Sequence, residues 1–441
     1  MQKPAPAGES KSWLDRTREK FAPENPDGTT SEPGRRRAMA LLFTSLIANG
    51  LGQTLMFAIL PPLANDLGLT EFGMGAIFAI SAFLWVFSSA YWGARSDVWG
   101  RRPVILIGIA AFAISTFAFA SVLQFGLWGL IPPAMLFPLM VATRSIYGLF
   151  GAGAYPAAQG YIADRTSSSE RTEGIAMLNA AFGLGAAIGP GVGAALTIFG
   201  VVAPLYFVAF MALVSTVAVW LLLPERSAPH QRKIEKPLSW FDPRVLPFVV
   251  FAVMQGTAGS IPTQTVAFMI RDMQKLSISE TQQLAGVALM GMAIAALFAQ
   301  FVLVQRFKLT TRFLIIAGII VALISNLLVV VASNYGLLAF ALVLSGLGFG
   351  MLRPGVAAAA SLSVSSEEQG AMAGLTGGAG AAGFIFAPLV GNGLYSWSPI
   401  APYWFGAILM VLLLVFVITN SRIKSAVIQT FDGTSSDIQP P

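Results

Sequence analysis

Two arginines stand inside long apolar segments of this 441-residue sequence. Arg144 lies within the apolar stretch 133–162, and Arg353 lies within 336–362. A charge inside a membrane-spanning segment is costly to place there and is by default a functional hypothesis. The chemistry open to these residues is electrostatic, because a fixed cation attracts anionic groups and repels cationic ones. The alternative for Arg144 is a structural tie to backbone carbonyls or polar side chains. For Arg353 it is a side chain that extends to the membrane interface.

Amide side chains lie on several other apolar segments. Asn49 and Gln53 are one helical turn apart within 38–62, and Met56 and Phe57 follow on the same side. Three further amides lie on later segments: Asn179, Gln255 and Gln264. We expect these residues to line a cavity and to orient a bound solute, although interhelical hydrogen bonding is the alternative for each amide taken singly.

Carboxylates are missing from the middle of every apolar segment. Asp66, Glu71 and Asp272 fall at one end of their segments, and Asp164 falls at the other. A cation entering a cavity between these segments would meet repulsion from the arginines and no counter-charge. The charges therefore favour a neutral or anionic solute.

The sequence offers little to a metal ion or a cofactor. It holds no cysteine, and its one histidine, His230, lies in a polar stretch. Thiolate metal sites and disulfides are thus excluded, and we expect neither a metal nor a cofactor.

The composition is that of a membrane protein, because 55% of the residues are hydrophobic and only 11% are charged, against roughly 25% charged in soluble domains. About twelve apolar segments are present, and most exceed the ~20 residues that a helix needs to cross a bilayer. They do not alternate as β-barrel strands do, so the sequence predicts an all-α protein with twelve transmembrane helices. The segments are 38–62, 73–93, 103–124, 133–162, 172–197, 201–223, 245–270, 283–305, 312–333, 336–362, 370–396 and 400–420.

Basic residues gather in alternate loops, which predicts one orientation. They precede the first segment and follow the even-numbered ones, as in the groups Arg35–Arg37, Arg101–Arg102 and Arg422–Lys424. Because such loops face the cytoplasm, both termini are expected there. The same bias explains the net charge of +6, so nucleic-acid binding is not needed to account for it. The polar ends, 1–36 and 426–441, are expected to be disordered cytoplasmic tails.

The turn between the second and third segments carries a recognisable pattern. Gly93 to Arg102 reads Gly-x-x-Ser-Asp-x-x-Gly-Arg-Arg. This closely resembles the loop between helices 2 and 3 of the major facilitator superfamily of transporters. The residues that match the pattern are Gly93, Asp97, Gly100, Arg101 and Arg102. The resemblance implies a conformational latch in which Asp97 pairs with neighbouring arginines. Arg95 and Val98 depart from the family pattern, and an ordinary basic turn is the alternative.

A weak internal repeat supports the same family. Pro156 and Pro354 are 198 residues apart, and so are Pro190 and Pro388. The polar stretch 224–244 divides the chain into an N-terminal six-helix bundle, 37–223, and a C-terminal one, 245–425. Two such halves with a substrate site between them describe the major facilitator fold. The resemblance covers nearly all of 38–422.

The fifth segment carries glycines at a spacing of four residues, at Gly185, Gly189 and Gly193. They form a stripe without side chains that permits close helix packing, and Pro190 favours a kink. The segment is similar to the Gly-Pro motif that marks antiporters of the superfamily, which implies export. The position of Arg144 resembles a family arginine with an assigned role in proton transfer or substrate response. The expected participant in proton coupling is Arg144 with its neighbours or, alternatively, Asp66.

These observations converge on a monomeric secondary transporter of the bacterial inner membrane. We expect it to export a neutral or anionic drug or metabolite by proton antiport with alternating access, so its partners are the solute, protons and the lipid bilayer. The alternative is a proton-coupled importer of a sugar or carboxylate metabolite. A membrane-embedded enzyme would need a cluster of His, Asp or Glu that the sequence does not show, and no phosphate-binding loop for ATP is present.

Overall fold

The computed structural model describes residues 32–63, 65–164, 168–224, 238–307, 309–365, 368–420 and 423. Within these residues, twelve helices are long and apolar enough to cross a membrane, and each overlaps one of the predicted segments. The predicted tails lie outside the described residues, except that 32–36 form the start of a helix. Most of the predicted linker, 224–244, lies outside them as well.

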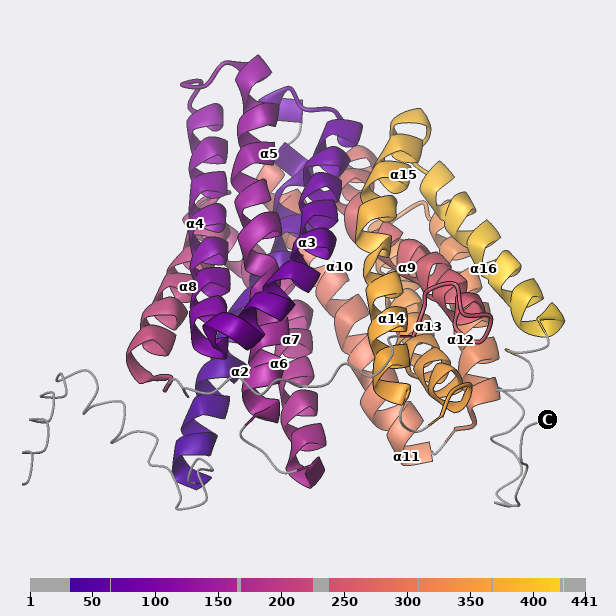
Figure 1. The fold of residues 1–441 in the computed structure, drawn as a ribbon. Helices are drawn as coiled ribbons and strands as arrows, with labels where there is room; N and C mark the ends of the chain where they lie inside the picture. The colour runs from indigo at the N-terminus through magenta and orange to yellow at the C-terminus, as the bar shows by residue number, and fades with distance from the viewer. Residues whose placement is uncertain are drawn as a thin grey trace, which may run out of the picture.

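The helices pack as two bundles, which Figure 1 shows as an indigo-to-magenta half and a pink-to-yellow half. The first bundle comprises α2 (Glu32–Ile59), α3 (Glu71–Trp99), α4 (Arg101–Leu127), α5 (Pro133–Phe150), α6 (Ala154–Ala163), α7 (Ser168–Leu196) and α8 (Ala203–Leu222). The second comprises α9 (Leu246–Gln274), α10 (Ile278–Phe298), the π-helical turn η5 (Ala299–Val304), α11 (Gln305–Phe307), α12 (Thr311–Val330), α13 (Tyr335–Leu362), α14 (Gln369–Ala381), α15 (Gly383–Trp397) and α16 (Ala401–Thr419). The short turns η1 (Pro61–Leu63) and η2 (Asn65–Leu67) follow α2, while η3 (Gly151–Gly153) joins α5 to α6 and η4 (Thr197–Phe199) follows α7.

Side-chain caps begin several of these helices. The hydroxyl of Thr70 accepts a hydrogen bond from the Gly73 amide at the start of α3. Ser277 and Glu280 form a reciprocal capping box at the start of α10. Such caps satisfy amides that the first helical turn leaves unpaired, so they define where these helices begin.

The structure corrects the prediction of a ten-residue turn at Gly93–Arg102. Helix α3 continues to Trp99, and α4 begins at Arg101. The turn is therefore Gly100 alone, whose φ of 95° is a conformation that side chains disfavour. The latch residues thus belong mainly to two helix ends, and this gives them more fixed positions than a loop would.

The predicted glycine stripe of α7 packs against α2. A β-carbon at Gly185 would lie 2.2 Å from the carbonyl oxygen of Ile47, and one at Gly189 would lie 2.6 Å from that of Leu51. At Gly193 the nearest atom would be 3.1 Å away. The stripe lets the two helix backbones approach closely, as the sequence pattern predicts.

The apolar core shows how the bundles are joined. One cluster of buried residues includes members of both bundles, such as Leu55, Ile59, Val266 and Leu289. Three further clusters belong to single bundles, two in the second bundle and one in the first. The bundles therefore share a core at one end, where α2 ends and α10 begins, and have separate cores toward the other. We call these the joined end and the open end.

Candidate functional site

A cavity of about 800 Å³ lies between the two bundles. Its lining comes from α2, α3, α5, α6 and α7 on one side and from α9, α10, α13, α14 and α15 on the other. This volume is in the range of sites that bind drug-sized molecules. A site formed by both bundles changes shape whenever the bundles move relative to each other.

Polar contacts close the cavity at the joined end. The Arg271 guanidinium of α9 pairs with Asp66 of the first bundle, with 3.2 Å between Nη2 and Oδ1, and also donates to the Pro62 carbonyl. The Gln282 side chain of α10 donates to the Ile59 carbonyl at 2.9 Å. Every ion pair and hydrogen bond that joins described residues of one bundle to described residues of the other lies at this end.

Backbones of the two bundles also meet directly at the joined end. A β-carbon at Gly75 of α3 would lie 2.2 Å from the carbonyl oxygen of Pro388 in α15. One at Gly286 of α10 would lie 2.4 Å from the carbonyl oxygen of Pro190 in α7. Besides its position in the Gly-Pro motif, Pro190 therefore lies where α7 meets the opposite bundle.

Most of the predicted site residues share the cavity. Seven of them line it: Asn49, Gln53, Phe57, Arg144, Asn179, Gln264 and Arg353. Gln255 and Met56 are buried but do not belong to the lining. Asp66 lies outside the cavity, in the ion pair at the joined end. The two alternative candidates for proton coupling, Arg144 and Asp66, therefore lie at different places, one in the cavity and one at the joined end.

Arg144 is held by side chains of neighbouring helices. Its Nη2 donates to Gln53 Oε1 at 2.7 Å, and its carbonyl accepts a hydrogen bond from Ser81 at 3.1 Å. The guanidinium lies 5.1 Å from the centre of the Tyr147 ring, and the Tyr147 hydroxyl donates to Asn49 at 3.3 Å. Nε and Nη1 of Arg144 are buried without a partner among the described residues. Both readings of Arg144 therefore have a basis here, since it ties α5 to α2 and also presents free donors at the cavity.

Arg353 lines the cavity from α13, and its side chain is exposed there. Among the described residues it has neither an ion pair nor a hydrogen bond. The described residues that line the cavity include no aspartate or glutamate. The charge at this position is therefore not neutralised within the described cavity.

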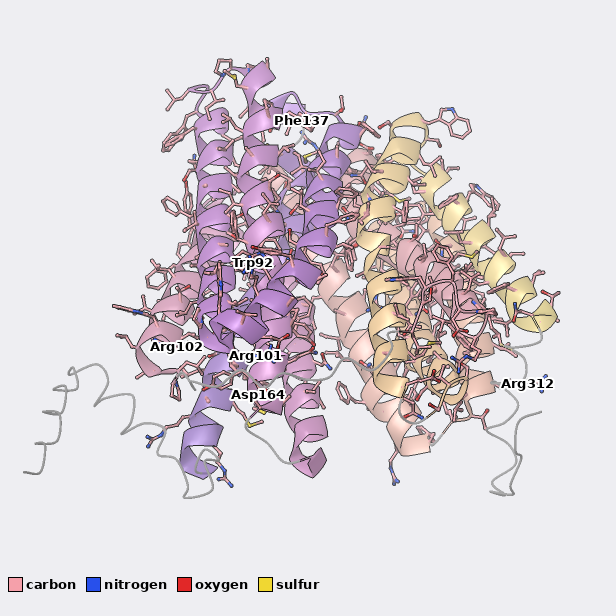
Figure 2. The ribbon with its side chains drawn as sticks, viewed as in Figure 1. Trp92, Arg101, Arg102, Phe137, Asp164 and Arg312 are labelled. Carbon is pink, nitrogen blue, oxygen red and sulfur yellow. The ribbon has the colours of Figure 1, made fainter. Side chains whose placement is uncertain are left out.

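Two of the latch residues, Asp97 and Arg101, belong to one charged cluster at the open end of the first bundle. Arg101 pairs with Asp97 at 2.6 Å and with Asp164 at 3.0 Å, and it also donates to the Ser96 hydroxyl. Arg102 points elsewhere and donates to the Trp220 carbonyl of α8. Figure 2 shows Arg101 and Asp164 next to each other at this end. The cluster joins the end of α3, the start of α4 and the end of α6, so the predicted pairing of Asp97 is present and extends to a third helix.

A sequence profile of the Major Facilitator Superfamily matches residues 42–303 and 246–436. The chain belongs to the major facilitator superfamily. Multidrug resistance protein 1 of Bacillus subtilis (strain 168) is 25% identical over 383 residues, which are 85% of this chain and 94% of that protein. Quinolone resistance protein NorA of Staphylococcus aureus (strain MRSA252) is 23% identical over 395 residues, or 87% and 97% of the two chains. A bacterial homologue of the human lysosomal transporter Spinster, solved in an inward-facing and occupied conformation, matches the fold with a TM-score of 0.67 at 16% identity, covering 91% of this chain and 98% of that one.

Members of this superfamily are transporters, so the family also identifies the chain as a transporter rather than an enzyme. Among the described residues, no group of three His, Cys, Asp or Glu side chains is close enough to hold a metal ion.

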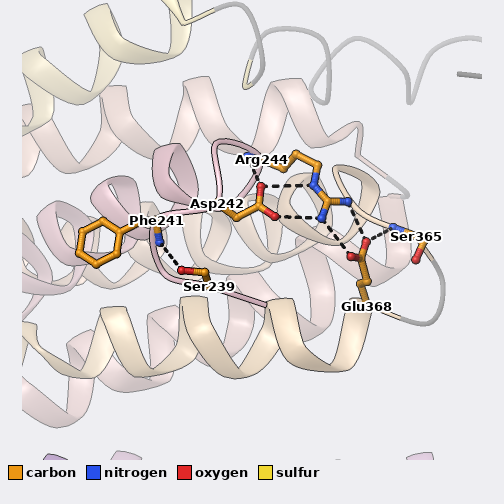
Figure 3. A network of polar contacts seen from close by, with 6 residues as sticks. All are labelled: Ser239, Phe241, Asp242, Arg244, Ser365 and Glu368. Carbon is orange, nitrogen blue, oxygen red and sulfur yellow. Dashed lines mark hydrogen bonds and ion pairs between the residues drawn. The ribbon is translucent and has the colours of Figure 1, made fainter. Parts of the chain in front are cut away.

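The second bundle of this superfamily member has a charged cluster that sequence reasoning missed. Arg244 pairs with Asp242 and with Glu368, each at 2.9 Å, and so ties the segment before α9 to the start of α14 (Figure 3). The Ser365 amide also donates to Glu368. Hydrogen bonds from Arg244 lower the pKa of Glu368, and those to Asp242 and Glu368 raise the pKa of Arg244. Arg244 and Glu368 are 124 residues apart, and no motif in the sequence links them.

Phe57 was the only residue of the cavity's aromatic wall that the sequence identified. Besides Phe57, the first bundle contributes five aromatic side chains: Phe78, Trp85, Tyr147, Tyr155 and Phe182. Phe57 and Phe78 are in contact, with ring centres 5.3 Å apart. These residues lie in runs where nearly every residue is apolar, so only the rotation of each helix distinguishes a cavity position from a lipid-facing one.

Proposed function

We propose that this chain exports a neutral or anionic organic solute across the bacterial inner membrane, by proton antiport with alternating access. The observation that carries the proposal is the cavity between the bundles, which is closed at the joined end and contains two arginines and no carboxylate among its described lining residues. Such a cavity suits a solute without positive charge. The similarity to proteins named for multidrug and quinolone resistance supports export. The expected partners are the solute, protons and lipid, with a monomer as the working unit.

The charges of the helix ends support an orientation with the open end in the cytoplasm. Arg101, Arg102, Arg244 and Arg312 lie at that end, and basic residues mark the cytoplasmic face. The joined end has fewer basic residues, and one of them, Arg271, is paired with Asp66. Helix α2 begins and helix α16 ends at the open end, so both chain termini would be cytoplasmic. The conformation described here would then receive solute from inside the cell, which is the loading step of an exporter.

Inverted membrane vesicles test the direction and the coupling together. A transported solute added to vesicles with an acidic lumen is expected to enter them and to release luminal protons, because antiport exchanges one for the other. The measurement is solute uptake recorded with a luminal pH dye, and a protonophore should abolish uptake. Uptake that is independent of pH would contradict proton antiport. Accumulation only in right-side-out vesicles would instead favour the importer of sugars or carboxylates, against which the Gly-Pro stripe of α7 argues.

The latch cluster gives a second prediction. Asp97→Asn is expected to lower the export rate at most about fivefold, because the pair is partly exposed and such pairs contribute up to about 1 kcal/mol. Arg101→Gln is expected to lower it further, since it releases Asp97 and Asp164 together. The measurement is the initial rate of solute uptake per unit of protein in the membrane.

Arg95→Gln serves as the matched control for these latch variants. Arg95 lies on the same helix end but stacks on Trp99, and no carboxylate of the described residues pairs with it. Full activity in Arg101→Gln, or equal losses in Arg95→Gln and Arg101→Gln, would contradict a role for the cluster.

A further inference from the structure

We propose that the C-terminal wall of the cavity is a receptor for the acidic group of an amphipathic organic anion, such as an aromatic carboxylate or sulfonate. In this arrangement Arg353, Gln264 and Ser345 bind the anionic oxygens, and the apolar body lies against the aromatic wall of the first bundle. The inference rests on the proposed function, because it takes this cavity to be the transport site. It goes further by choosing the anionic class and by assigning the residues that recognise it.

Arg353 supplies the charge of the receptor. It shares one face of α13 with Ser345 and Phe349, since the three are spaced by four residues, and all three line the cavity. Its side chain is exposed to the cavity and has no ion-pair or hydrogen-bond partner among the described residues. A planar guanidinium in this state offers two parallel donors, which match the two oxygens of a carboxylate.

Two buried donors without partners accompany this charge. Gln264 Nε2 and Ser345 Oγ lack hydrogen bonds among the described residues, although the two side chains are only 3% and 1% exposed. Leaving such a group unpaired costs about 1–3 kcal/mol, so a ligand that accepts from it gains that amount. The helices that carry them pack together, because a β-carbon at Gly259 of α9 would lie 3.2 Å from the Phe349 ring of α13. Acidic oxygens are acceptors only, which is what a site made of donors requires.

The opposite wall is suited to an apolar body. It presents the rings of Phe57, Phe78, Trp85 and Phe182. The cation on this side, Arg144, already donates to Gln53 and lies over the Tyr147 ring. The two walls therefore differ: Arg353 on the second bundle has no hydrogen-bond partner among the described residues, whereas Arg144, which keeps two unpartnered donors, is held by Gln53 beside the aromatic surface of the first. A ligand with one acidic end and one aromatic end would contact both bundles at once.

Binding to the purified full-length protein in lipid nanodiscs tests this receptor. The probes are naphthalene-1-acetate, naphthalene-2-sulfonate and pyrene-1-butyrate, each compared with its uncharged primary amide by titration calorimetry. We expect at least one acid to bind at least tenfold more tightly than its amide. Arg353→Gln is expected to remove this preference and to leave amide binding unchanged. Arg353→Lys keeps the charge without the paired donors, so it should retain part of the preference.

Matched controls separate recognition from general damage. Arg312→Gln removes an arginine at the start of α12, outside the lining, and should leave the acid preference intact. Gln264→Leu should weaken acid binding by about five- to 150-fold, whereas Gln255→Leu, on the same helix but outside the lining, should not. If Arg353→Gln fails to fold, Arg353→Lys and Gln264→Leu carry the test.

The outcomes distinguish this inference from the proposed function. Equal binding of acids and amides, or equal weakening of both by Arg353→Gln, would overturn the receptor even if the vesicles show proton-coupled export of neutral compounds. Acid binding that depends on Arg353 would support the receptor even if the same acids release no protons from vesicles, in which case the antiport proposal fails instead.

Discussion

Gly286→Ala is expected to shift the equilibrium constant between the conformation described here and one that is open at the joined end by roughly five- to 150-fold, toward the latter. A β-carbon at this position would lie 2.4 Å from the Pro190 carbonyl oxygen and 2.5 Å from Ala194 Cβ, both in the opposite bundle. Neither of those atoms belongs to a long flexible side chain that can move aside. Overpacking of this kind costs about 1–3 kcal/mol, and here the bundles relieve it by separating at the joined end.

Distances between spin labels measure this shift. The chain has no cysteine, so labels attach only where cysteines are introduced. Leu130→Cys and Trp397→Cys place exposed labels on different bundles at the joined end. Val98→Cys and Phe307→Cys do the same at the open end. Gly286→Ala should populate longer distances in the first pair and shorter ones in the second.

Gly291→Ala, on the same helix, is the matched control. There the added carbon would meet only Val343 Cγ2, at an ordinary 3.5 Å. Both substitutions raise the helix propensity of α10 by the same amount, so this contribution cancels in the comparison. Unchanged distances in Gly286→Ala, or equal shifts in the two variants, would contradict direct packing of Gly286 against α7 as the cause.

Arg144→Gln is expected to lower the export rate by roughly 10- to 150-fold while the protein still inserts in the membrane. The substitution removes a buried charge and leaves Gln53 Oε1 without its donor at 2.7 Å. A hydrogen bond to a charged group contributes about 1.5–3 kcal/mol, which corresponds to this range if it is needed for transport. The measurement is the initial export rate in proteoliposomes, normalised to folded protein.

A double-mutant cycle with Gln53→Leu identifies the interaction. If Arg144 acts through Gln53, the two losses should not add, because each variant breaks the same contact. Additive losses would show that Arg144 acts through its free Nε and Nη1 donors at the cavity instead. Wild-type rates in Arg144→Gln would contradict any role in transport.

Hydropathy predicted all twelve helices, yet it placed the end of the second one six residues too early. It reports which residues belong in lipid, whereas a helix ends where its backbone hydrogen bonds end. Residues 94–99 are more polar than the segment before them, so they were assigned to the turn. The helix nevertheless continues to Gly100, the residue that permits a positive φ.

The cavity could be predicted only in part, and α9 shows why. Gln264 lines the cavity and Gln255 does not. They are nine residues apart, and at 3.6 residues per turn this places them on opposite faces of a helix. The sequence thus already implied that both could not face one cavity, but not which of them would. The pairing of Arg244 with Glu368 was beyond prediction, because the two are 124 residues apart and are joined only by the packing of α14 on α9.

The apolar core shared at the joined end also affects how the transport cycle depends on temperature. Opening that end separates residues such as Leu55 and Leu289 that now belong to one cluster. Exposing apolar surface to water raises the heat capacity. A plot of the free-energy difference between the two conformations against temperature is therefore curved. The curvature increases with the part of the opening that is filled by water and not by lipid. The temperature at which this transporter turns over fastest would be set in part by how much of this core is wetted in each cycle.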